Sequence, residues 1–234
     1  MRPNIKGMKI KKAAFAGSST TLKGRPGRRY PEIAFIGRSN VGKSSLINML
    51  CSGAEKITKG KELARTSSSP GKTISINHFL INDSWYLVDL PGYGYAKISG
   101  KMRDELARMN NEYIGGSEEL ATLFVLLDSR HSLQKVDLDF ITALGEEGIP
   151  FSIIFTKADK PNKSELEKNI ENVKKSLSEY WEELPPVFTS SAEKKTGKEE
   201  ITAYMEKVLN LFKEAKKAEE KAKIIIAENY LNHI

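Results

Sequence analysis

The residues with the clearest chemical potential lie in "GRSNVGKSS", residues 37–45. This segment contains the pattern G-x-x-x-x-G-K-S, whose backbone N–H groups surround the phosphates of a nucleotide. Lys43 would reach the β- and γ-phosphates, and the hydroxyl of Ser44 would ligate Mg²⁺. An apolar "EIAFI" before the motif and a helical "SSLINML" after it supply the strand, loop and helix that the motif requires. The predicted phosphate-binding residues are Gly37, Arg38, Ser39, Asn40, Val41, Gly42, Lys43, Ser44 and Ser45.

A second motif, "DLPG", ends the apolar run "WYLVDLPG" and follows the first by about 45 residues. In P-loop nucleotide hydrolases, an aspartate at the end of such a strand supports Mg²⁺, usually through a water, and the glycine N–H senses the γ-phosphate. On its own, D-x-x-G is a common tetrapeptide that usually marks a turn. Its position after a P-loop favours the nucleotide role, and the predicted residues are Asp89, Leu90, Pro91 and Gly92.

The segment "TKAD" indicates which base is bound. Guanine presents two neighbouring donors, and the carboxylate of Asp159 can accept from both, whereas adenine would leave that charge unpaired. The stem of Lys157 can pack on the base, and "SSA" further along offers backbone amides near the guanine O6. We therefore expect guanine nucleotides, GTP and GDP, to be contacted by Thr156, Lys157, Ala158, Asp159, Ser190, Ser191 and Ala192.

A threonine from the first switch loop would complete the Mg²⁺ shell. The stretch from about Gly53 to Pro70 is rich in Ser, Gly and Lys and predicts a long loop. This Ser-rich region offers Thr66 and Thr73, and Thr73 is the better candidate because it directly precedes the next strand. The alternative for Thr73 is a simple strand-entry role. We predict a switch segment of Gly71, Lys72, Thr73, Ile74 and Ser75, metal ligands Ser44, Thr73 and Asp89, and catalytic roles for Lys43, Thr73 and Gly92.

In "DLPGYGYAK", Tyr93 occupies a place where related switches often carry a water-orienting glutamine. A tyrosine cannot orient water as an amide does, and no arginine finger can be assigned from sequence, so we expect slow hydrolysis. Tyr93 and Tyr95 can instead be aromatics that pack the switch against the domain. We favour a mixed role in which this segment rearranges with the nucleotide and presents Lys97, Lys101 and Arg103 to a partner.

The elements that must position these motifs alternate along the chain from residue 30. Strand-like apolar runs followed by helical patterns predict an α/β fold, a P-loop GTPase domain with helices on both faces of a mostly parallel sheet of about six strands. The run "SINHFLINDSWYLVDL" predicts a hairpin and hence one antiparallel strand. We divide the chain into a basic arm at 1–29, with an edge strand near 9–16, a GTPase domain at 30–212 and a helical extension at 213–234.

Charge and composition limit the remaining possibilities. The arm holds nine of the 37 basic residues and none of the 30 acidic ones, so the net charge of +7 comes from it, and it can contact polyanions. A solvated arm and a transit peptide are the alternatives. No apolar run is long enough to span a bilayer, and the single cysteine, Cys51, lies in an apolar run where burial is expected. We expect a monomer in the cytosol.

The motifs "GRSNVGKSSLIN", "ARTSSSPGKT", "DLPGYGYAK", "DSRH", "TKADK" and "SSA" together resemble the EngB family, also called YihA or YsxC, of bacterial GTP-binding proteins. The resemblance covers about residues 9–212 and does not extend to the last 22 residues. It implies GTP binding with slow Mg²⁺-dependent hydrolysis, association with the large ribosomal subunit during its assembly, and a link to cell division and septation.

Two further expectations follow from this resemblance. An asparagine at the position of Asn40 helps related GTPases to hold K⁺, which can replace the charge of an arginine finger, so K⁺ near Asn40 is a hypothesis. A GTP-regulated adaptor in cell division, without direct ribosome contact, is the alternative function. A P-loop ATPase or kinase conflicts with Asp159.

Overall fold

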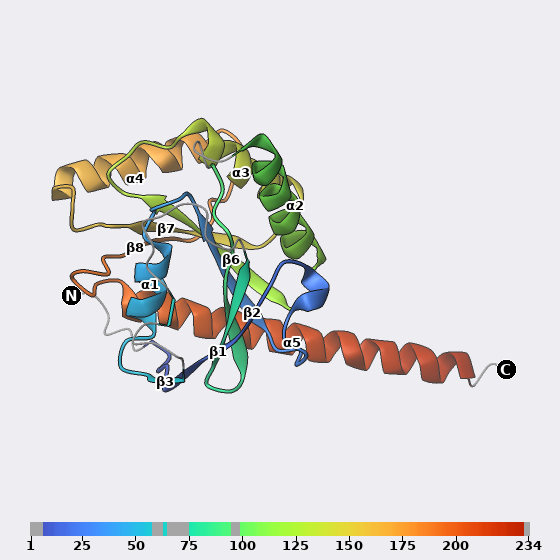
Figure 1. Cartoon of the computed structure of the whole chain (residues 1–234). Coiled ribbons are helices and arrows are strands. Elements are labelled where there is room, and N and C mark those ends of the chain that lie inside the picture. Colours follow the sequence, from blue (N-terminus) through green and yellow to red (C-terminus); the bar gives the residue numbers. More distant parts are fainter. Residues whose placement is uncertain (1–6, 58–62, 65–74, 95–98, 232–234) are drawn as a thin grey trace.

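The computed structural model describes residues 7–57, 63–64, 75–94 and 99–231 of the chain. Its centre is an eight-stranded sheet with the order β3-β1-β4-β5-β2-β6-β7-β8 (Figure 1). The strands are β1 Lys12–Ser19, β2 Glu32–Gly37, β3 Glu55–Ile57, β4 Ile76–Ile81, β5 Trp85–Asp89, β6 Leu120–Asp128, β7 Phe151–Thr156 and β8 Val187–Thr189.

The pairing of the strands agrees with the predicted α/β class. Neighbouring strands are parallel except at the two edges of β4, which is antiparallel to β1 and to β5. The predicted hairpin joins β4 and β5 through Asn82 and Asp83, whose φ angles of 49° and 53° suit a tight turn. The sheet is wider than the expected six strands, because β1 and the short β3 extend it on one side.

Two hydrophobic cores cover the sheet. Helices α1 (Lys43–Leu50) and α5 (Lys198–Leu231) pack on one face, with Leu46, Ile47 and Met205 among their buried residues. Helices α2 (Gly100–Gly116), α3 (Lys135–Glu146) and α4 (Lys163–Ser178) pack on the other face. Because β2 and β6 have helices on both sides, their central runs, Ile33–Ile36 and Leu123–Leu127, are apolar and buried.

The N-terminal region contributes to this fold. Ile10 and Ala13 are buried in the core beneath α1 and α5, and β1 lies between β3 and β4 in the sheet. A short 3-10 helix, η1 (Leu22–Gly24), follows β1 and places Leu22 beside Gly116 at the end of α2. Lys9 and Lys11 therefore lie directly before a folded strand.

Helix α5 is continuous over 34 residues and runs past the sheet toward the C-terminus (Figure 1). Its buried side chains end at Leu209, and Leu211, Ile224 and Ile225 are exposed. Within the described residues, no helix is both long and apolar enough to cross a membrane.

Candidate nucleotide-binding site

The predicted motifs meet at the carboxyl ends of neighbouring parallel strands, where ligands of open α/β sheets bind. Strand β2 leads into the phosphate loop, β5 ends at Asp89, β6 ends at Asp128 and β7 ends at Thr156. These four strands are adjacent in the sheet. Motifs as far apart in sequence as Gly37 and Thr156 therefore share one edge of the sheet.

Two residues of the phosphate loop have a left-handed backbone conformation. Asn40 and Gly42 have φ angles of 62° and 103°, both in the left-handed region, and Gly42 is the N-cap of α1. A side chain at Gly42 would lie in a strained backbone conformation, because L residues rarely adopt that φ. The turn directs the first N–H groups of α1 toward the loop, which gives a place for an anion at a helix N-terminus.

Lys43 and Asp89 form an ion pair across the phosphate end of the site. Their side chains are only 15% and 12% exposed, so both are largely removed from solvent. Ser44 is the next residue of α1, and its hydroxyl and the Asp89 carboxylate are oxygen donors of the kind that Mg²⁺ accepts. Because Lys43 contacts Asp89, the first turn of α1 lies beside the end of β5, and the oxygen donors of Ser44 and Asp89 are of the type that a Mg²⁺ site uses.

The base end of the site is connected to the phosphate loop by Thr156 and Lys157. The hydroxyl of Thr156 donates to the carbonyl oxygen of Val41 at 2.5 Å. The ammonium of Lys157 donates to the carbonyl oxygen of Asn40 at 2.6 Å and to Oδ2 of Asp128 at 2.8 Å. A Cβ atom on Gly42 would lie 3.6 Å from Cε of Lys157, so the lysine stem passes directly over the loop.

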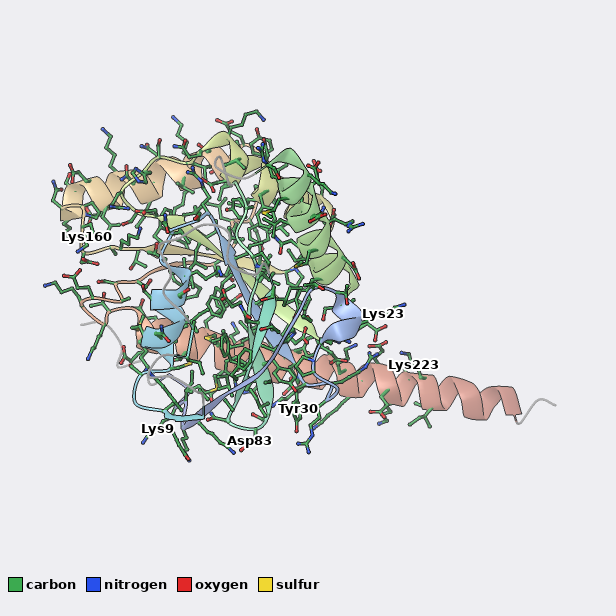
Figure 2. All side chains as sticks on the ribbon, in the orientation of Figure 1. Lys9, Lys23, Tyr30, Asp83, Lys160 and Lys223 are labelled. Carbon is green, nitrogen blue, oxygen red and sulfur yellow. The ribbon has the colours of Figure 1, made fainter. Side chains whose placement is uncertain are left out.

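Asp159 is held in place by two side chains. The hydroxyl of Ser191 donates to its Oδ1, and the ammonium of Lys160 lies 3.1 Å from its Oδ2. The hydrogen bond from Ser191 lowers the pKa of Asp159 below its ordinary value. Lys160 also pairs with Glu193, and Figure 2 shows it at the end of the molecule remote from Lys223. Asp159 is therefore an oriented carboxylate that stays ionised.

The "SSA" segment contributes fewer free amides than the sequence suggested. The N–H of Ser190 donates to the carbonyl of Phe155 at 2.8 Å, and the N–H of Ser191 donates to that of Thr196 at 3.2 Å. Within the described part of the chain, this leaves the N–H of Ala192 as the amide of this segment that a base can use. The carbonyl of Ser190 accepts from the N–H of Ala158 at 3.0 Å, which joins the two base-binding segments.

Tyr93 is anchored to α3 by its side chain. Its hydroxyl donates to Oδ1 of Asp137 at 3.0 Å, and its ring stacks on Phe140 with centroids 4.5 Å apart. Burial, followed by the neighbouring charge of Asp137, raises the pKa of Tyr93 well above its ordinary value. Arg38 Nη1 lies 4.0 Å from Oδ2 of the same aspartate. Tyr93 therefore packs the second switch against α3 as a neutral phenol.

Part of the predicted switch segments lies outside the described residues. This is the case for Gly71, Lys72, Thr73 and Ile74, for the alternative Thr66, and for Tyr95 and Lys97. Ser75 is described, and its hydroxyl donates to Oδ1 of Asn77 at 3.2 Å. Leu90, Pro91 and Gly92 continue from β5 as a loop next to Tyr93. The amide of Asn110 on α2 fixes this loop by donating to the carbonyl of Pro91 at 3.0 Å.

Sequence reasoning did not assign a role to Asn48. This α1 residue accepts from the N–H groups of Leu63 and Ala64 at 3.0 and 3.1 Å, and donates to the carbonyl of Ala64 at 2.8 Å. Asn48 thus attaches the loop that precedes the first switch to the helix that follows the phosphate loop. A polar residue within the helical run "SSLINML" was the signal for it.

Comparisons with known proteins agree with this geometry. Residues 32–157 match a family described as "50S ribosome-binding GTPase". The chain is 59% identical over 201 residues to the probable GTP-binding protein EngB of Porphyromonas gingivalis, covering 86% of this chain and 96% of that one. It is 56% identical over the same length to the protein of that name from Bacteroides thetaiotaomicron, with 86% and 96% covered.

Solved structures show the same fold. A crystal structure of a probable GTP-binding protein engB has a TM-score of 0.60 at 20% identity, covering 76% of this chain and 98% of that one. The structure of a variant of Aquifex aeolicus Era bound to GDP and AlF4⁻ has a TM-score of 0.54 at 19% identity, with 80% and 57% covered.

Proposed function

Because the chain belongs to the EngB family of GTP-binding proteins, we propose that it is a slow, Mg²⁺-dependent GTPase that serves as a switch in assembly of the large ribosomal subunit in the bacterial cytoplasm. The observation that carries the nucleotide part is the oriented carboxylate of Asp159 next to the phosphate loop. It accepts from Ser191 on one oxygen and is paired with Lys160 at the other. Asp159 would accept the N1–H and 2-amino group of guanine, and Ala192 N–H would donate to O6.

At the phosphate end, Lys43 exchanges its contact with Asp89 for the β- and γ-phosphates. The loop amides and the N-terminus of α1 receive the remaining phosphate oxygens. Ser44, Asp89 and the predicted switch residue Thr73 would hold Mg²⁺, which supplies charge neutralisation on the phosphate oxygens when bound. Gly92 would offer its N–H to the γ-phosphate.

Slow turnover is supported by the contacts of Tyr93 and Arg38. Tyr93 is a neutral phenol whose hydroxyl is bonded to Asp137, so it does not accept a proton from water. Arg38 also faces Asp137. Positioning and charge alone then drive the reaction, and an arginine finger, which is worth about 10³ to 10⁵ in rate, would have to come from outside. Hydrolysis of radiolabelled GTP and ATP, each with and without Mg²⁺, tests this part.

K⁺ bound near Asn40 is the second element of the proposal. Asn40 has a left-handed backbone whose carbonyl is occupied by Lys157, so its side chain is the group available for a cation. We expect faster hydrolysis in K⁺ than in Na⁺ at equal ionic strength, and loss of that difference in Asn40→Ala. Equal rates in both salts would remove K⁺ from the mechanism and leave the GTPase assignment in place.

The ribosomal part of the proposal is supported by the description of the matched family and by the basic N-terminal region, residues 1–29. It is preferred to a cell-division adaptor without ribosome contact because that description names the 50S ribosome. Lys9 and Lys11 are exposed at the start of this folded region and can contact RNA phosphates. A link to division and septation would then follow from the supply of ribosomes.

Sedimentation with ribosomal particles tests the partner. We expect the protein to travel with large-subunit particles in GTP or a non-hydrolysable analogue, less so in GDP, and with strong salt dependence. The double variant Lys9→Glu and Lys11→Glu should weaken this binding, whereas Lys163→Glu and Lys168→Glu on exposed α4 gives the same charge change as a control. Nucleotide-independent binding, or an equal loss in both double variants, would contradict the proposal.

A further inference from the structure

The strongest unassigned arrangement next to the site is the turn that follows β6. Its first residue, Asp128, accepts hydrogen bonds on both carboxylate oxygens. Oδ1 accepts from the backbone N–H of Arg130 at 3.1 Å and from its Nε at 2.9 Å. Oδ2 accepts from Nη2 of Arg130 at 2.7 Å and from Nζ of Lys157 at 2.8 Å. The carboxylate thus joins a guanidinium and an ammonium.

The backbone of this turn is fixed from two sides. The N–H of Ser129 donates to the carbonyl of Thr156 at 3.1 Å, which ties the turn to the end of β7. The amide of Asn169 on α4 donates to the carbonyl of Ser129 at 2.8 Å. Asp128 is therefore held by elements of the rigid sheet and helix layer. Its own carboxylate then determines where the Lys157 ammonium lies.

The electrostatic balance also favours a fixed Lys157. Partial burial of Asp128 alone would raise the pKa of its carboxyl, but the hydrogen bonds from Arg130 and Lys157 outweigh that effect and lower the pKa well below its usual range. The carboxylate is therefore charged at any working pH. Its side chain is 13% exposed and that of Lys157 is 26% exposed, so solvent screens this pair only in part.

We propose that Arg130 and Asp128 are positioning residues that act through Lys157 to set how long a guanine nucleotide stays bound. Lys157 touches the carbonyl of Asn40 in the phosphate loop and supplies the stem that packs on the base. Asp128 gives its ammonium a second anchor, and the fork of Arg130 fixes the orientation of Asp128. The inference rests on the proposed guanine contacts of Lys157, which is itself in a left-handed backbone conformation with φ of 56°.

The test is the dissociation rate of a fluorescent GDP analogue, measured by stopped flow. Loss of one charge-assisted hydrogen bond predicts release faster by about 10- to 100-fold in Asp128→Asn. Arg130→Met should accelerate release by less, about 3-fold, because the Arg130 side chain is 44% exposed and its guanidinium acts only through Asp128. Asp139→Asn is the matched control, because this exposed aspartate pairs with Lys135 on the outer face of α3, and its rate should not change.

A double-mutant cycle separates positioning from a purely structural role. In a Lys157→Met background, Asp128→Asn and Arg130→Met should each leave the dissociation rate unchanged, because the group they act through is gone. Additive effects in that background would overturn the inference. So would an Asp128→Asn variant that melts at a lower temperature but releases GDP at the wild-type rate.

Folding of the variants and the choice of base give two further readouts. If Asp128→Asn does not fold, the double-mutant cycle can be carried out with Arg130→Met alone, since the Arg130 side chain lies at the surface of the turn.

The faster release should be equal for guanosine and inosine diphosphates, because Asp159 and not Asp128 contacts the 2-amino group. Failure of wild-type protein to bind GDP would instead contradict the proposed function, which makes the two failures distinguishable.

Discussion

At the proposed base end of the site, Asp159 and Lys157 each have two partners in the folded protein. Ser191 and Lys160 hold Asp159, and Asp128 and the carbonyl of Asn40 hold Lys157. At the phosphate end, Lys43 contacts Asp89, and these are the groups that we propose for the phosphates and Mg²⁺. The base end is therefore preorganised, whereas at the phosphate end Lys43 and Asp89 must give up their mutual contact before they can bind a ligand.

This difference between the base end and the phosphate end suits a protein whose conformation changes with the bound nucleotide. A preorganised base pocket selects guanine without reorganisation cost, so GDP and GTP both benefit equally from it. The phosphate end distinguishes the two nucleotides, since only contacts that change with the γ-phosphate can shift a conformational equilibrium. Rearrangement is therefore expected where Lys43, Asp89 and the switch loops meet.

The largest effect should come from Lys43→Ala at the phosphate end. This change removes two charge-assisted hydrogen bonds to phosphates, worth about 3 to 6 kcal/mol together, so nucleotide affinity should fall by at least ~100-fold. Equilibrium titration with fluorescent GDP and GTP analogues measures it. Lys135→Ala, at an exposed lysine on α3, is the control. An affinity within about 3-fold of wild type would place the phosphates elsewhere.

Next in size is Asp159→Asn at the base end. The amide keeps one acceptor but turns a donor toward the guanine 2-amino group, which should cost about 2 to 4 kcal/mol. Xanthine carries a carbonyl at that position, so affinity for xanthosine diphosphate should rise as affinity for GDP falls. Competition titrations with both nucleotides measure the exchange. A parallel loss of both affinities would show that the base pocket has lost its shape.

The sequence predicted which residues would face the base and which would face the phosphates. It did not predict that Asp159 and Lys157 are already held in place while Lys43 and Asp89 contact each other. The phosphate loop and the end of β5 were recognisable because glycine, lysine and aspartate occur there at fixed spacing between a strand and a helix. The contact of Lys43 with Asp89 joins residues 46 apart, and its formation depends on the packing of β2 beside β5. No local pattern encodes such a contact.

Two other details differ from the prediction for the same reason, because they depend on contacts between residues that are distant in sequence. The sequence led us to expect free "SSA" amides, yet the N–H of Ser190 bonds to Phe155 in β7 and that of Ser191 bonds to Thr196 in the following loop. The Ser- and Gly-rich stretch from residue 53 was expected to be a loop, whereas Glu55–Ile57 forms β3 because β1 presents an open edge to it. Both outcomes depend on a neighbour that is distant in sequence.

A smaller change, Ser191→Ala, tests how far the base end is preorganised. Loss of one hydrogen bond to Asp159 should weaken GDP binding by about 1 kcal/mol, or ~5-fold. Since that bond lowers the pKa of Asp159, guanine binding in wild type is complete above this pKa and is lost as pH falls through it. The variant should lose binding at a higher pH than wild type. Ser178→Ala on α4 is the control, and an unchanged pH profile in Ser191→Ala would contradict preorganisation by Ser191.

The smallest effect on chemistry is expected from Tyr93→Phe, which separates packing from catalysis at the second switch. The ring can keep its stacking on Phe140, while Asp137 loses the phenol donor. Because Arg38 and the N-terminus of α3 still face Asp137, the free energy of unfolding should fall by only about 1 kcal/mol. Urea unfolding measures this loss, with exposed Tyr180→Phe as the control.

Single-turnover hydrolysis of GTP by Tyr93→Phe should stay within about 2-fold of wild type, because a phenol bonded to Asp137 stabilises no charge on the phosphates. A general acid or base would contribute about 10² to 10⁴ in rate, so its loss could not be mistaken for a packing effect. A large fall in rate at unchanged stability would move Tyr93 from the packing of α3 into the reaction. The phosphate end would then contain a catalytic side chain whose partner must change as GTP binds.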